Sequence, residues 1–99
     1  MKKIEIFVRH CTISKFSADR ERIRGFSKEE CCKNLKQTID KSLTNITFMM
    51  DGDLNDHFLK NEKEYRVIPI KGGSQAKSWQ GTLEYVSNNN FSDDQIIYF

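Results

Sequence analysis

The sequence has little excess charge of either sign, because 16 lysines and arginines are nearly matched by 14 aspartates and glutamates. The net charge is +2 and the two signs are interspersed, so the chain has no strong electrostatic attraction for nucleic acid or for an anionic membrane. No segment approaches the roughly 18 apolar residues that a membrane-spanning helix needs. We therefore expect no nucleic-acid partner and no membrane span.

Cysteine is also scarce. The chain has three cysteines, Cys11, Cys31 and Cys32. Their number is odd and their spacing matches neither a disulfide framework nor a zinc site. Two lysines follow Met1 at the N-terminus, but Glu5 and Arg9 interrupt any apolar core of a signal peptide. Both observations favour a cytoplasmic location.

The length of 99 residues has room for one small domain, and the chain shows no repeats, low-complexity segments or linker. Short β-rich runs at 4–8, 46–50, 65–70 and 95–99 predict four strands. Segments 27–43, 54–60 and 74–87 predict helices between them. The order β-α-β-α-β-α-β predicts a Rossmann-like α/β fold with a mainly parallel, open sheet. The near-continuous apolar run at 46–50 is typical of a strand that is covered on both faces.

Two of the helices carry an apolar face at three- and four-residue spacing. In the first helix this face consists of Cys31, Cys32, Leu35, Ile39 and Leu43. In the last helix it consists of Ala76, Trp79, Leu83 and Val86. Ser27 with Glu30 forms a capping box at the start of the first helix, and Phe26 with Cys31 would form a hydrophobic staple. We expect these faces, including the cysteines and Trp79, to lie in the core.

Ligands of open α/β sheets bind beyond the carboxyl ends of the strands, where loops 10–25, 51–55 and 71–74 are expected. Asp51 and Asp53 follow the second strand directly, and such a carboxylate can accept hydrogen bonds from a ribose hydroxyl or a base N–H. Both could also meet a divalent cation. The alternative is a plain turn in which Asp53 caps the next helix.

Lys71, Gly72, Gly73 and Ser74 lead from a strand into a helix, where glycines and free N–H groups allow a phosphate to approach closely. The alternative is a flexible turn with Ser74 as the N-cap.

Arginines in the first loop could grip a diphosphate or form a solvated surface. They are Arg20, Arg22 and Arg24. His10 ends the first strand at the same edge and is a candidate nucleotide contact. No residue at a matching spacing makes His10 and Cys11 a nucleophile or metal site, so a structural role for His10 is the alternative.

The sequence is similar to the N-terminal half of GT-A fold, family 2-like glycosyltransferases. The resemblance lies in the acidic turn at 50–53, the glycine-led helix start at 72–76 and the apolar strand at 95–99. In that family the aspartate that corresponds to Asp51 contacts the base or ribose, and the last strand leads into an Asp-x-Asp motif that holds a metal and the sugar diphosphate. The resemblance implies a nucleotide-diphosphate sugar as the ligand.

The resemblance also implies that this chain is a fragment of a longer domain, truncated before the Asp-x-Asp motif. The expected nucleotide-binding residues are His10, Asp51, Asp53, Gly72, Gly73 and Ser74. We expect no catalytic residue, no cofactor within the chain and no turnover by these residues alone, whereas an intact relative would use Mn²⁺ or Mg²⁺. The open apolar strand at 95–99 could also pair with a second copy to form a homodimer.

The alternative function is a small non-catalytic α/β module with a regulatory or protein-interaction role. The acidic turn at 51–53 would then be a metal or phosphoacceptor site, or only a turn.

Overall fold

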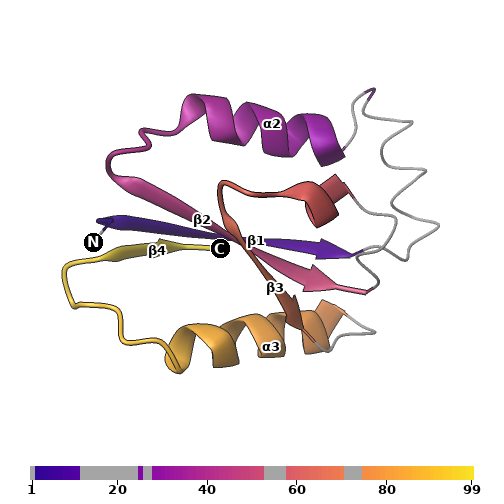
Figure 1. Ribbon diagram of the computed structural model, residues 1–99. Helices are drawn as coiled ribbons and strands as arrows, with labels where there is room; N and C mark the ends of the chain where they lie inside the picture. The colour runs from indigo at the N-terminus through magenta and orange to yellow at the C-terminus, as the bar shows by residue number, and fades with distance from the viewer. Residues whose placement is uncertain (1, 12–24, 26–27, 53–57, 71–74) are drawn as a thin grey trace.

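Four parallel strands form one sheet in the computed structural model, and helices cover both of its faces (Figure 1). The structure describes residues 2–11, 25, 28–52, 58–70 and 75–99. The strands are β1 (Ile4–Cys11), β2 (Thr44–Asp51), β3 (Arg66–Ile70) and β4 (Ile96–Tyr98), in the order β3-β2-β1-β4. The helices are α2 (Lys28–Thr38), the 3-10 helix η1 (Phe58–Asn61) and α3 (Gln75–Ser87). The predicted α/β class with an open parallel sheet is confirmed.

The main hydrophobic core lies between the sheet and the layer formed by α2 and η1. In β2, Ile46, Phe48 and Met50 point to this side, where they pack with Cys32 of α2 and Leu59 of η1. Successive side chains of a strand face opposite sides. Met49 points to the α3 side and is as fully buried as Phe48, so β2 is covered on both faces, as its apolar run predicts.

Helix α3 turns a different face to the sheet from the one that its apolar residues predict. Ser78 and Thr82 are buried, whereas Leu83 is 51% exposed. Gly81 lies so close to β3 that a Cβ on it would be 3.3 Å from the Cβ of Ile70. The Thr82 hydroxyl donates to the Ser78 carbonyl oxygen at 2.9 Å, so the buried hydroxyl has a hydrogen-bond partner. Close approach of the helix to the sheet therefore selects small side chains over the larger apolar ones.

Helix α2 is shorter than expected, because it ends at Thr38 and not near Leu43. The Asp40 carboxylate accepts hydrogen bonds from the backbone N–H and the hydroxyl of Ser42, at 2.9 and 2.6 Å. The Asp40 carbonyl oxygen also accepts from the backbone N–H of Leu43 and Thr44. This turn feeds directly into β2 and leaves Leu43 46% exposed, so the prediction of Leu43 as a core residue was wrong.

Other boundaries differ by a few residues. β1 continues to Cys11, three residues beyond the predicted end, because it pairs with β2 as far as Cys11 opposite Asp51. The second predicted helix is the 3-10 helix η1, and residues 54–57 of that prediction lie outside the described residues. Ser27 and Phe26, of the predicted cap and staple, also lie outside them. No helix within the described ranges has the length and apolar character needed to cross a bilayer.

Candidate functional site

The strand order creates a topological switch point between β1 and β4. After β1 the chain adds β2 and then β3 on one side, and it returns through α3 to add β4 on the other side (Figure 1). Ligands of open α/β sheets bind at such a point, beyond the carboxyl ends of the strands. The last pairing of β1 with β4 is Ile6 opposite Tyr98, so β1 extends past β4 toward this edge. Arg9 and His10 lie near the end of β1 and Asp51 ends β2, so all three lie at this end of the sheet.

Arg9 lies on the α3 side of this edge, stacked on the ring of Trp79. Its guanidinium carbon is 3.7 Å from the ring centroid, which is cation–π geometry. The Trp79 ring also contacts Phe99, with 5.8 Å between the ring centroids. Burial lowers the pKa of Arg9 from its ordinary value. Among the described residues no carboxylate forms an ion pair with Arg9, and its planar guanidinium carries N–H donors of a kind that match the oxygens of an anion.

Asp51 is the last residue of β2, and it is buried with 8% of its surface exposed. Gly52 follows with a φ of 115°, a backbone conformation that favours glycine. Arg9 pairs with Met49 of β2, and Asp51 lies two residues after Met49, so the Arg9 and Asp51 side chains share one face of the sheet. From strand spacing and rise, the Cα atoms of Arg9 and Asp51 are about 8 Å apart. The carboxyl end of the sheet thus carries a cation, Arg9, and a carboxylate, Asp51, on adjacent strands and on the same face of the sheet.

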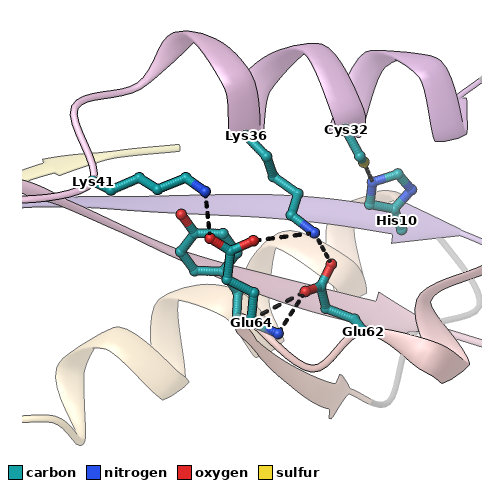
Figure 2. Close-up of polar contacts among 7 residues, drawn as sticks. His10, Cys32, Lys36, Lys41, Glu62 and Glu64 are labelled. Carbon is teal, nitrogen blue, oxygen red and sulfur yellow. Dashed lines mark hydrogen bonds and ion pairs between the residues drawn. The ribbon is translucent and has the colours of Figure 1, made fainter.

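His10 points to the opposite face of the sheet, into the core beneath α2. Its Nε2 atom lies 3.1 Å from the Sγ atom of Cys32 (Figure 2). The ring also makes an edge contact with Phe58 at a centroid distance of 5.7 Å. No spacing in the sequence indicates this partner of His10, because Cys32 lies 22 residues away on another element. Its part in nucleotide binding stays a prediction.

The Cys32 thiol is protonated at neutral pH. Burial, with smaller contributions from Cys31 and Glu62, raises its pKa from 9.0 to about 11. A catalytic cysteine needs a lowered pKa, because the thiolate is the nucleophile. The His10–Cys32 pair is therefore a structural hydrogen bond between β1 and α2.

Charged residues on the α2 side form a cluster that joins α2 to the segment before β3 (Figure 2). Lys36 Nζ lies 2.7 Å from Glu62 and 3.7 Å from Glu64, and Lys41 Nζ lies 2.8 Å from Glu64. Burial alone would raise the pKa of Glu62, but hydrogen bonds from Lys36 and from the backbone N–H of Glu64 and Tyr65 outweigh it and lower the pKa. A groove of about 710 Å³ runs beside this cluster. Lys36 and Lys41 already form ion pairs with Glu62 and Glu64. The cluster is therefore better explained as a set of ion pairs that stabilises the fold than as an anion-binding site.

The remaining predicted site residues lie outside the described residues. They are Asp53, Gly72, Gly73, Ser74, Arg20, Arg22 and Arg24. Arg9 was missed as a site residue, although its place near the end of the first strand was a usable signal. No group of three or more histidine, cysteine, aspartate or glutamate side chains in the described ranges could hold a metal ion.

Comparison with known proteins gave no match to a family model, a curated protein or a solved structure. The structure by itself defines a small α/β domain with a four-stranded, all-parallel sheet.

Proposed function

We propose that this chain is the nucleotide-sugar-binding portion of a glycosyltransferase-like protein, and that a nucleotide-diphosphate sugar binds at the carboxyl edge of the sheet. One observation carries the proposal: Arg9 and Asp51 lie on adjacent strands and on the same face, next to the β1–β4 switch point. The strand order supports it, because nucleotide-binding sheets use this position.

The two side chains suit the two ends of such a ligand. Asp51 accepts hydrogen bonds from a ribose hydroxyl or a base N–H and so orients the nucleoside. Arg9 offers a planar set of N–H donors that matches phosphate oxygens. Stacking on Trp79 holds the guanidinium in place before the ligand arrives, which reduces the entropy lost on binding.

The proposal keeps the sequence-based assignment of Gly72, Gly73 and Ser74 to the phosphates, through their backbone N–H groups, and of Asp53 to the nucleoside or a cation; these four residues lie outside the described residues. His10 holds the end of β1 against α2 and so positions this edge. We assign binding and no turnover to these residues, and no step of the proposal passes through a metal ion.

The test uses Trp79, which is the single tryptophan of the chain and stacks on Arg9. UDP, GDP and their sugar conjugates are titrated into the protein with and without Mn²⁺, and tryptophan fluorescence is recorded. We expect saturable quenching, weakened about tenfold or more by Arg9→Gln and by Asp51→Asn. Inorganic diphosphate should compete in the parent and in Asp51→Asn but not in Arg9→Gln.

Matched controls separate the site from general charge effects. Arg66→Gln removes an exposed arginine at the start of β3, at the amino end of the sheet, and Asp93→Asn removes an exposed aspartate. Both should bind as the parent does. If no nucleotide changes the fluorescence at about 10 mM, or if both site variants bind like the parent, the proposal is wrong. That result would favour the non-catalytic α/β module.

A further inference from the structure

A second polar cleft lies at the amino edge of the sheet, on the α3 side and away from the proposed nucleotide site. Its volume is about 370 Å³, within the range of small-molecule sites. Its lining includes Glu5, Asn45, Thr47, Arg66, Tyr85 and Phe91. The register pairs Glu5 with Asn45 and Thr47 with Arg66. Three adjacent strands therefore present polar side chains to one cavity.

Glu5 is the unusual residue of this cleft, because it is a carboxylate with only 8% of its surface exposed. One carboxylate oxygen accepts a hydrogen bond from Asn45 Nδ2 at 2.9 Å. No lysine or arginine in the described part of the chain forms an ion pair with it. The Arg66 guanidinium acts on this carboxylate electrostatically but forms no close ion pair with it, so it offsets the cost of burying the charge only in part. A ligand that brings a positively charged donor would offset that cost.

Arg66 provides the opposite charge on the far side of β2. Its Nη1 atom donates to the Tyr85 hydroxyl at 3.2 Å, which directs the side chain along the cleft wall. This hydrogen bond is the largest cause that raises the pKa of Arg66, and the Glu5 carboxylate adds to it. The other carboxylate of the lining, Glu64, is already paired with Lys41 at 2.8 Å. Glu5 and Arg66 thus place a carboxylate and a guanidinium on opposite sides of one cavity.

We propose that this cleft binds a small zwitterion of the α-amino acid class, with its ammonium group on Glu5 and its carboxylate on Arg66. Glu5 and Arg66 lie on β1 and β3, and their register partners on β2 are two residues apart, so strand spacing and rise place their Cα atoms about 12 Å from each other. Two long side chains that reach toward each other over this distance leave room for one small molecule. Asn45 and Thr47 lie on the intervening strand and offer further hydrogen bonds. The lining is too polar to favour an apolar ligand.

The test begins with NMR titration of the ¹⁵N-labelled chain with a panel of L-α-amino acids. We expect at least one to shift the amide signals of residues 5, 45–47 and 66. Its N-acetyl derivative lacks the ammonium group and its amide lacks the carboxylate, so each should bind about tenfold more weakly or worse. Glu5→Gln should abolish the preference for the free amino acid over the N-acetyl derivative. Arg66→Gln should abolish the preference over the amide.

Glu84→Gln is the matched control, because Glu84 is an exposed carboxylate of α3 outside this cleft, and it should bind as the parent does. Glu5→Gln keeps the shape of the side chain and an oxygen that can accept from Asn45 Nδ2, and so a folded variant is expected; the melting temperature of the free protein checks this. The proposal is overturned if no amino acid shifts these signals at about 10 mM, or if both cleft variants keep the parent's preferences. Nucleotide binding at the other edge is measured separately and does not depend on this outcome.

Discussion

The Nε2 atom of His10 lies 3.1 Å from the Sγ atom of Cys32, and this contact joins the carboxyl end of β1 to α2. A histidine beside a cysteine often indicates a nucleophile and its base. Here the thiol is buried and its pKa is raised to about 11, which is opposite to what such a nucleophile needs. The pair stabilises the sheet edge on which the proposed nucleotide site depends.

Cys32 should therefore react slowly with alkylating agents in the folded protein, and Cys31, which is partly exposed, should react faster. The rise in pKa lowers the thiolate fraction of Cys32 about 100-fold near pH 8, and burial slows the reaction further. The measurement is iodoacetamide labelling followed by mass spectrometry, with Cys31→Ser and Cys32→Ser compared in a Cys11→Ser background. Equal labelling rates for the two remaining thiols would contradict the structural assignment.

Glu62→Gln should destabilise the fold by about 1–2 kcal/mol, because Glu62 accepts a charge-assisted hydrogen bond from Lys36 at 2.7 Å and is largely buried. The carboxylate also accepts from the backbone N–H of Glu64 and Tyr65. Urea unfolding at neutral pH measures the change. Glu64→Gln is the control, and it should change stability little since Glu64 is exposed.

The same residue should make stability depend on acid pH. The pKa of Glu62 is lowered from 4.5 in the folded state. Its contribution is therefore complete above the unfolded value of 4.5 and is lost as the pH falls through the folded pKa. Urea unfolding of the parent and of Glu62→Gln between neutral pH and pH about 3 should show a smaller acid loss in the variant. Parallel curves would show that Glu62 does not contribute to the pH dependence.

Gly81→Leu should destabilise the protein by about 1–3 kcal/mol, because a side chain at this position would overpack the contact with Ile70. Ala76→Leu adds a similar side chain to an exposed position of the same helix, and it should have little effect. Thermal unfolding followed by circular dichroism compares the two variants. Equal stability of both would mean that α3 does not approach β3 as closely as the structure has it.

Local patterns were sufficient to predict the fold class. The apolar run at 46–50 predicts a strand buried on both faces, and β2 is such a strand. Strands that alternate with helices predict a parallel sheet, since crossovers return the chain in the same direction. These signals depend on residues close together in sequence.

The side-chain pairs that define the sites depended on contacts between distant elements. No fixed spacing links Arg9 with Trp79, His10 with Cys32 or Glu5 with Asn45. The inward face of α3 was also mispredicted, because hydrophobic periodicity favours Leu83 whereas close packing against Ile70 favours Gly81 and Thr82. The sequence alone thus determined the α/β class and the doubly covered second strand. The order β3-β2-β1-β4 and the pairs at both sheet edges came from packing, because crossovers and strand register bring those residues together.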